Sequence, residues 1–156
     1  MRSIKLLLAA IVAILNVQLT FAEKAYVFTY FDNSKQSAGM CMAYSYDGFH
    51  WTALNNNKPI ITPEIGKENV LRDPSVCQGP DGTFHMVWTT AWRDNYCIGY
   101  ASSKDLIHWS QQREISVMHD FPTTRNVWAP ELFYDKKSGL FYIYWASTVP
   151  GAKNVS

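Results

Sequence analysis

Two segments of the chain place a carboxylate beside a proline at the start of an expected strand. Asp73 directly precedes Pro74, and Glu131 directly follows Pro130. Because proline fixes its own φ and restricts the residue before it, we expect Asp73 to be extended. If both strands are the innermost of their sheets, the two acids occupy equivalent positions and face one cavity. One carboxylate can then activate water while another group protonates a leaving oxygen, which is the chemistry of polysaccharide cleavage.

Three further side chains could hold a substrate beside these acids. Arg72 directly precedes Asp73, while Trp92 lies in an expected loop and Trp128 at an expected strand start, both outside the regular pattern of the other tryptophans. Rings in such places can stack on the faces of sugars. The candidates also have a plainer interpretation. Asp before Pro is a common turn opener, and an acid near a strand start, such as Glu131, usually faces solvent.

The elements that must position these residues repeat along the chain. Three aromatic, β-branched segments start at Tyr26, Phe84 and Phe141, which are 58 and 57 residues apart. A second match, ending in His-Trp, relates residues 43–51 to residues 101–109 at the same spacing. A period of this length, built from strands and turns without helical patterning, predicts the blades of a β-propeller.

The repeats predict an all-β fold, a partial propeller of about two and a half blades, each a four-stranded antiparallel sheet. We expect the blades at about residues 23–63, 64–120 and 121–156. In the complete second repeat, strands are predicted at 75–78, 83–90, 97–102 and 108–114. The first repeat has no segment for an innermost strand, and the third stops halfway. We therefore expect a fragment of a longer protein, inactive by itself, because fewer than three full blades cannot close a ring.

The remaining tryptophans fall at equivalent places of the repeats, so we expect them to pack between sheets rather than to bind a ligand. These residues are Trp51, Trp88, Trp109 and Trp145. His85 stands between two apolar residues of an expected strand, and we predict that it is a hydrogen-bonded strand residue rather than a ligand.

The first 22 residues have the pattern of a secretory signal peptide. Arg2 and Lys5 precede an apolar run at residues 6–15, and Ala22 offers a cleavage site before Glu23. Because this segment holds two basic residues and no acidic one, its removal changes the formal net charge from +1 to −1. Nothing in that balance recruits nucleic acid or an anionic membrane surface. We expect a secreted or periplasmic protein, free of the membrane after cleavage.

The three cysteines, Cys41, Cys77 and Cys97, allow at most one internal disulfide. In an exported chain such an odd set leaves at least one thiol unpaired, and we expect buried free thiols. No Cys or His spacing indicates a metal site.

Four ordered segments resemble the N-terminal blades of glycoside hydrolase family 43. The resemblance covers essentially all of residues 25–150. It implies a five-bladed propeller that acts on α-L-arabinofuranosides, β-D-xylosides or related plant-polysaccharide linkages with inversion. The segments are RDPSV at 72–76, GPDGTFHMVWT at 79–89, IGYASSKDLIHW at 98–109 and WAPE at 128–131.

The resemblance also implies roles for single residues. The family's Asp-Pro supplies the general base, which carries over to Asp73. Apart from the resemblance, we expect Arg72, Trp92, Trp128 and Glu131 to be substrate-binding residues. The family's general-acid Glu and pKa-tuning Asp come from later blades and are not identified in this sequence. The Arg-Asp-Pro motif also resembles the transition-state-stabilising motif of the related fructan and sucrose hydrolases. No cofactor is required for this chemistry, and no metal ligands are predicted.

Two other functions remain open from the sequence. A sialidase-like propeller would use residues 45–51 as an Asp-box hairpin, but it would also need a cluster of arginines to hold a carboxylate substrate. A non-catalytic carbohydrate-binding propeller would use Trp92 and Trp128 to bind sugar and Asp73 only as a hydrogen-bond acceptor. In each case the expected partner is an oligosaccharide or polysaccharide.

Overall fold

The computed structural model describes residues 24–32 and 39–151, so the predicted signal peptide lies outside the described residues. Strands and tight turns make up almost all of the regular structure, as the aromatic, β-branched repeats predict. One short 3₁₀ helix, η1 (Asn55–Asn57), follows the first sheet. The strands are β1 (Tyr26–Phe31), β2 (Met40–Ser45), β3 (Thr52–Ala53), β4 (Arg72–Gln78), β5 (Phe84–Thr89), β6 (Cys97–Ser103), β7 (Arg113–Ser116), β8 (Trp128–Asp135) and β9 (Leu140–Ala146).

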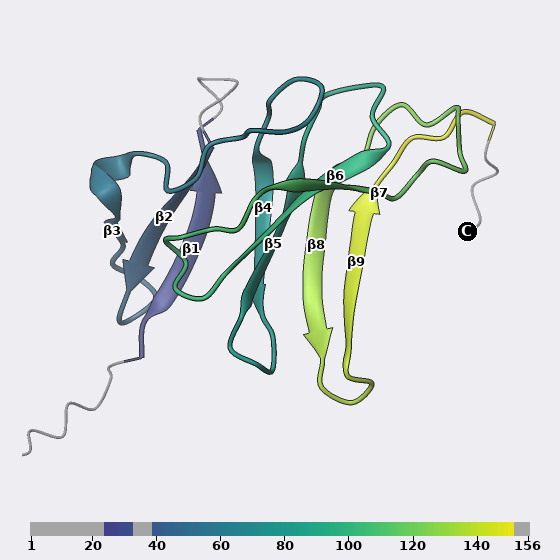
Figure 1. The fold of residues 1–156 in the computed structure, drawn as a ribbon. Helices are drawn as coiled ribbons and strands as arrows, with labels where there is room; N and C mark the ends of the chain where they lie inside the picture. Colours follow the sequence, from purple (N-terminus) through teal and green to yellow (C-terminus); the bar gives the residue numbers. More distant parts are fainter. Residues whose placement is uncertain (1–23, 33–38, 152–156) are drawn as a thin grey trace, which may run out of the picture.

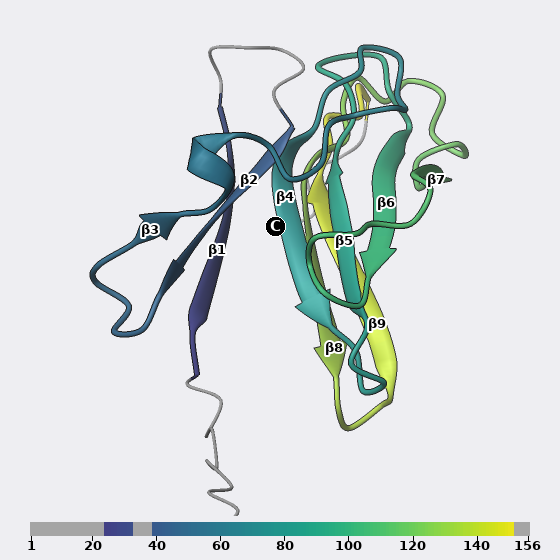
Figure 2. The same cartoon turned by 60° about the vertical axis from the view of Figure 1, so that its left-hand side comes forward.

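The strands form three antiparallel sheets that follow one another along the chain (Figure 1). The first has the order β1-β2-β3, the second β4-β5-β6-β7, and the third β8-β9. β4 contacts both β1 and β8, so the second sheet lies between the other two, and the turned view shows the first sheet splayed away from the third (Figure 2). Successive antiparallel sheets arranged in this way are blades of a partial β-propeller. The predicted blade boundaries at about residues 63 and 120 stay predictions.

Strand register shows that β1 corresponds to β5 rather than to β4. Tyr26 pairs with Ser45 in the first sheet, and Phe84 pairs with Ser103 in the second. Each residue of the second pair therefore lies one repeat after its counterpart in the first pair. In the described part of the chain, the first sheet therefore has no counterpart of β4. Consistently, β1 contacts β4 as β5 contacts β8.

The innermost strands β4 and β8 each contain a bulge at the residue before proline. Asp73 has a φ of 49° and Ala129 a φ of 46°, and the pairing register shifts between Arg72 and Ser75 and between Trp128 and Glu131. The expectation that Asp73 is extended is therefore wrong, because the bulge inserts a left-handed residue into the strand. The same register makes Ala129 the equivalent of Asp73. The expected equivalence of Asp73 and Glu131 is also wrong, since Glu131 matches Ser75.

The core lies between the sheets and is built around Trp88, whose side chain is fully buried. Its ring lies against Gly99 on β6, where an added Cβ would come within 2.0 Å of the ring, so no larger residue fits. Trp109 and Trp145 pack at the edges of the two core clusters. Trp51 is 44% exposed, contrary to the prediction. Its ring contacts that of Phe28 in a tilted arrangement, with centroids 5.6 Å apart, and both rings line an open pocket on the first sheet.

The turns after β2 and β6 have the same hydrogen-bond network. Around both Asp47 and Asp105, the backbone N–H groups two and three residues later donate to the carboxylate Oδ1 at 2.8 to 2.9 Å. The imidazole of the following histidine contacts Oδ2 at 2.6 Å for Asp47 and 2.7 Å for Asp105. The turn extends to a bridge between Ser103 and Trp109, so the outer strand β7 begins at Arg113 rather than at the predicted residue 108.

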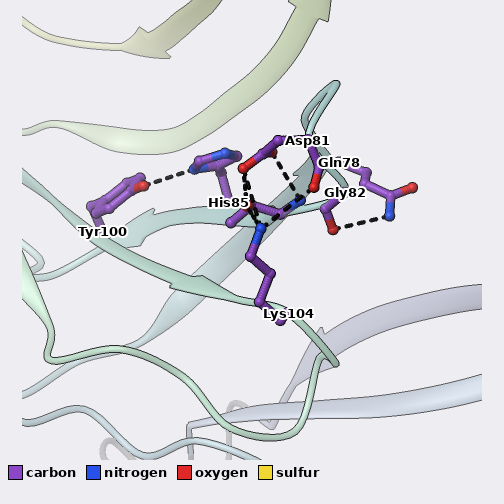
Figure 3. Close-up of polar contacts among 7 residues, drawn as sticks. Gln78, Asp81, Gly82, His85, Tyr100 and Lys104 are labelled. Carbon is purple, nitrogen blue, oxygen red and sulfur yellow. Dashed lines mark hydrogen bonds and ion pairs between the residues drawn. The ribbon is translucent and has the colours of Figure 1, made fainter.

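The cysteines are all free thiols: Cys41 is buried, and Cys77 and Cys97 are half-buried. His85 is a satisfied strand residue, as predicted, because its Nδ1 lies 2.7 Å from the hydroxyl of Tyr100 (Figure 3).

Candidate active site

Asp73 lies at the start of β4, where the bulge turns its carboxylate toward a cavity of about 250 Å³. The cavity opens at the ends of β4, β5 and β8. The residues that line it are Arg72, Asp73, Thr89, Trp92, Trp128 and Ala129. The structure thus brings together four of the five residues that the sequence singled out.

A single hydroxyl holds the Asp73 carboxylate. Thr89 Oγ1 donates to Asp73 Oδ2 at 2.9 Å, and it accepts a hydrogen bond from the backbone N–H of Ala129 at 2.9 Å. Because a threonine hydroxyl has one proton, the bond from Ala129 directs that proton to the aspartate. Among the described residues, Asp73 Oδ1 has no hydrogen-bond partner. One oxygen is therefore fixed, and the other is free to bind water or substrate.

Thr89 was not identified from the sequence, although it is 3% exposed and ties two blades together. The available signal was its position at the end of the aromatic strand, where it pairs with Arg72 across the hairpin. Strand pairing alone could not show that Thr89 belongs to the site, because its hydrogen-bond partner Ala129 is forty residues away and belongs to the next blade.

Within residues 24–32 and 39–151, Arg72 is held by aromatic rings and forms no ion pair with an acid. Its guanidinium carbon lies 3.8 Å from the centre of the Trp92 ring and 4.9 Å from that of Phe31, within the range of cation–π contacts. Arg72 therefore links the first sheet to the loop between β5 and β6. Because the guanidinium covers part of the Trp92 ring, stacking of a sugar on that tryptophan is restricted to the surface that stays open.

The two tryptophans of the cavity are tied to each other and to the preceding loop. Trp128 Nε1 donates to the backbone oxygen of Trp92 at 2.9 Å, and the Trp92 N–H donates to Glu68 Oε2 at 2.9 Å. Trp92 and Trp128 are 43% and 40% exposed. These exposed, anchored rings can present apolar surface to a ligand at little cost in side-chain entropy.

Glu131 does not line this cavity, although it was expected to. It lies two residues beyond the position equivalent to Asp73, is exposed, and accepts a long hydrogen bond of 3.4 Å from Ser75 Oγ. Ser75 Oγ also accepts a hydrogen bond from the Leu132 N–H at 3.0 Å. Glu131 therefore belongs to the contact between β4 and β8.

No group of three or more His, Cys, Asp or Glu side chains within residues 24–32 and 39–151 could hold a metal ion. In the same ranges, no helix is long and apolar enough to cross a membrane.

Comparisons with known proteins agree with this architecture. Among solved structures, a "putative exo-beta-1,3-galactanase" from Bifidobacterium bifidum is 16% identical and superposes with a TM-score of 0.59, over 81% of this chain and 42% of that one. Fructan 1-exohydrolase IIa from Cichorium intybus is 20% identical with a TM-score of 0.52, over 81% and 26%. The chain thus spans less than half the length of either structure. A comparison with curated proteins found no match.

The sequence comparison with protein families covers almost the whole chain. Residues 22–155 match the family described as "Probable glycosyl hydrolase domain", which is related to glycosyl hydrolase family 43. Together with the propeller fold, this match shows that the chain belongs to the glycosyl hydrolase 43-related family.

Proposed function

We propose that the protein to which this chain belongs is a secreted glycoside hydrolase. In this proposal it cleaves arabinofuranosyl or xylosyl linkages of plant polysaccharides with inversion at the anomeric carbon. Family membership supports the reaction class, and the cavity around Asp73 supports the position of the chemistry. The sugar specificity rests on the resemblance to glycoside hydrolase family 43, and the export rests on the N-terminal sequence pattern.

In the proposed reaction, Asp73 acts as the general base. A water molecule donates its proton to Asp73 Oδ1 while its oxygen bonds to the anomeric carbon. The bond from that carbon to the leaving oxygen breaks, and a carboxylic acid from a later blade protonates this oxygen. Room for the attacking water requires the two carboxyl groups to be about 6.5–9.5 Å apart. Thr89 fixes the second oxygen of Asp73, so that Oδ1 keeps one direction.

The observation that carries this proposal is the unequal use of the two Asp73 oxygens. Oδ2 is anchored by a buried hydroxyl, whereas Oδ1 has no partner in the described part of the chain and the side chain lines a cavity. By contrast, the turn carboxylates of Asp81 and Asp105 have partners on both oxygens. An acceptor that is positioned and still free is what general-base catalysis needs.

The test is turnover by the full-length protein with Asp73→Asn. With aryl α-L-arabinofuranoside and aryl β-D-xyloside as substrates, we expect turnover to fall about 10²- to 10⁴-fold. Asp81→Asn is the matched control, because Asp81 lies at the other end of the same hairpin and should leave turnover near that of the parent. NMR of the first-formed sugar should show the inverted anomer.

Three results would contradict this assignment. Retained turnover in Asp73→Asn would remove Asp73 from the role of base. A first product of retained configuration would exclude the single-displacement mechanism. Binding of the sugars by the parent protein without any turnover would favour a carbohydrate-binding propeller.

A further inference from the structure

A second cavity, of about 420 Å³, adjoins the Asp73 cavity. Trp128 lines both, and Arg93, which lines the second cavity, directly follows Trp92 of the first. Trp128 is therefore a wall that the two cavities share. The lining residues are Arg93, Asp94, Arg125, Asn126, Trp128 and Thr148.

The second cavity carries more positive than negative charge. Arg93 and Arg125 both line it, and Asp94 is the one acidic residue that does so. Across the described ranges, neither guanidinium forms an ion pair or a cation–π contact, in contrast to Arg72. These two arginines lie 32 residues apart in the sequence. Their convergence was not visible there, where the arginines appeared scattered.

The cavity is built from three loops whose backbones are bonded to one another. The Asp94 N–H donates to the Arg125 oxygen at 2.6 Å, and the Arg125 N–H donates to the Thr148 oxygen at 2.9 Å. Asn126, which is 5% exposed, accepts from the Thr148 N–H at 3.1 Å and donates to the Ala146 oxygen at 3.2 Å. The backbone positions of the arginines are thereby held before any ligand binds, which lowers the entropy cost of binding.

We propose that the cavity between Arg93 and Arg125 binds an anionic group, the carboxylate of a uronic acid or a sulfate ester, on the sugar next to the one at Asp73. This inference rests on the proposed function, because it names a substrate feature for that same site. The guanidinium fork matches the planar oxygens of a carboxylate and can bind it through two hydrogen bonds. Asp94 can accept a hydrogen bond from a sugar hydroxyl beside the anion, since an ionised carboxylate acts only as an acceptor.

The neutral alternative is a cavity with two solvated arginines and no preference for charge. It predicts equal affinity for a neutral and an anionic sugar chain. Our proposal predicts a preference for the anion that depends on both arginines and weakens with salt, because ions screen exposed charges.

The experiment measures binding by isothermal titration to the full-length protein carrying Asp73→Asn, so that hydrolysis does not consume the probe. The probes are a xylo-oligosaccharide that carries one glucuronic acid, the same compound as its methyl ester, and the same chain with a sulfate ester in place of the uronic acid. We expect at least one anionic probe to bind about tenfold or more tightly than the ester. The anionic probe that binds more tightly shows whether the site prefers the carboxylate of a uronic acid or a sulfate ester.

The matched variants are Arg93→Gln with Arg125→Gln, and Arg113→Gln as the control. Arg113 lies on β7, stacks on Tyr100 and does not line either cavity. We expect the double variant to lose the anion preference while its affinity for the ester stays unchanged, and Arg113→Gln to keep the preference. A double variant that keeps the preference would overturn the proposal.

The comparison of acid and ester in the protein without arginine changes needs no variant at this site, so misfolding cannot obscure it. Equal affinities for acid, sulfate and ester would overturn the proposal. Turnover of neutral substrates together with equal affinities would overturn this inference and leave the proposed function intact. Anion preference without any turnover would support the site and count against the proposed function.

Discussion

The two ends of the second sheet use aspartate in opposite ways. At the turn end, Asp81 accepts hydrogen bonds from the Thr83 hydroxyl and the Thr83 N–H and pairs with Lys104 at 3.2 Å (Figure 3). Asp105 is surrounded in a similar way by the turn after β6. At the other end, Asp73 has one hydroxyl partner among the described residues, and these offer none to its second oxygen. The carboxylates of Asp81 and Asp105, which have partners on both oxygens, hold turns. The carboxylate of Asp73, which has a partner on one oxygen, faces a cavity.

The pKa directions at the turn end have the same cause. The Thr83 hydroxyl, followed by the Thr83 N–H, lowers the pKa of Asp81 well below its usual value. The His108 side chain, followed by the backbone N–H groups of His108 and Ile107, does the same for Asp105. Hydrogen bonds to the ionised form stabilise it, so these groups stay charged and fixed near neutral pH. A residue that must take up a proton during each reaction cannot be held in this way.

Positive backbone φ occurs at both ends. In the turns it falls on Gly48, Gly82 and Leu106, with φ of 79°, 77° and 67°. At the cavity end it falls on Asp73 and Ala129, which carry side chains. A non-glycine residue in this region is strained, and such strain persists only where the surroundings enforce it. The bulge that aims Asp73 is therefore maintained by contacts between blades.

Within this comparison, the largest expected effect comes from Thr89→Val, because Thr89 holds the Asp73 carboxylate at the cavity end. The change keeps the shape of the side chain but removes the hydroxyl that donates to Asp73. Because small misplacements of a reacting group are costly, we expect kcat/KM to fall about 100-fold. Thr89→Ser keeps the hydroxyl and should retain most of the turnover, and equal losses in the two variants would contradict the positioning role.

The next largest effect is on stability, from Asp105→Ala at the turn end. Removal of the carboxylate leaves two backbone N–H groups without their acceptor, and we expect the melting temperature to fall by about 5 °C with kcat unchanged. Differential scanning calorimetry and turnover at 20 °C or so, well below the transition, measure both quantities. Asp47→Ala, in the same network of the first sheet, should give a similar loss. A drop in kcat without a loss of stability would contradict the purely structural role of Asp105.

The same variant also tests the direction of the pKa. The folded-state pKa of Asp105 lies below its ordinary value of 3.8, so its stabilisation is present above that value and is lost as the pH falls through the folded-state pKa. We expect the parent and Asp105→Ala to differ most in melting temperature above pH 4 or so and to converge in stronger acid. If the difference in melting temperature instead widened as the pH fell, the inferred direction of the Asp105 pKa shift would be wrong.

A smaller effect is expected from Gly48→Ala. The nearest atom to an added Cβ, on the Tyr26 ring, would be 3.9 Å away, so the cost is conformational and not steric. We expect a loss of about 1 kcal/mol in the free energy of unfolding, measured by urea denaturation. Gly82→Ala, which also has a positive φ and no atom within 4 Å, should lose a similar amount.

The smallest effect is expected from Lys104→Met. The pair that Lys104 forms with Asp81 is exposed, with side chains 70% and 63% accessible. Exposed pairs of this kind contribute little to stability, and salt screens them. We expect almost no change in melting temperature, and none at high salt. A clear destabilisation would mean that Lys104 and its contact to Thr83 are needed to hold the turn.

Much of the fold could be predicted from the sequence, because repeats and turn residues are local signals. Gly82 and the two aspartates of the His-Trp turns have the residue types that their turns require. The starts of β1, β5 and β9 lie within one residue of the repeat positions at 26, 84 and 141. Trp51 was misjudged because burial depends on a neighbouring sheet, and a period indicates which residues are equivalent without showing what covers them.

The candidate site was predicted only in part, for a related reason. Arg72, Asp73, Trp92 and Trp128 could be found because their types and places departed from the repeat. Glu131 was misplaced because it follows its proline, whereas Asp73 precedes its own, so that Glu131 matches Ser75 in the register. The role of Thr89 and the convergence of Arg93 with Arg125 could not be found from the sequence, since they depend on contacts between segments 32 to 40 residues apart.

By itself, the sequence determined the strands, the tight turns and the repeat that relates them, since hydrophobic period and turn chemistry act over a few residues. It also determined that an acid, an arginine and two tryptophans stand apart from that repeat. The tertiary structure alone decided which oxygen of Asp73 is free, which hydroxyl holds the other, and which arginines share a cavity. These properties depend on bulges and on contacts between blades, and such contacts join residues tens of positions apart.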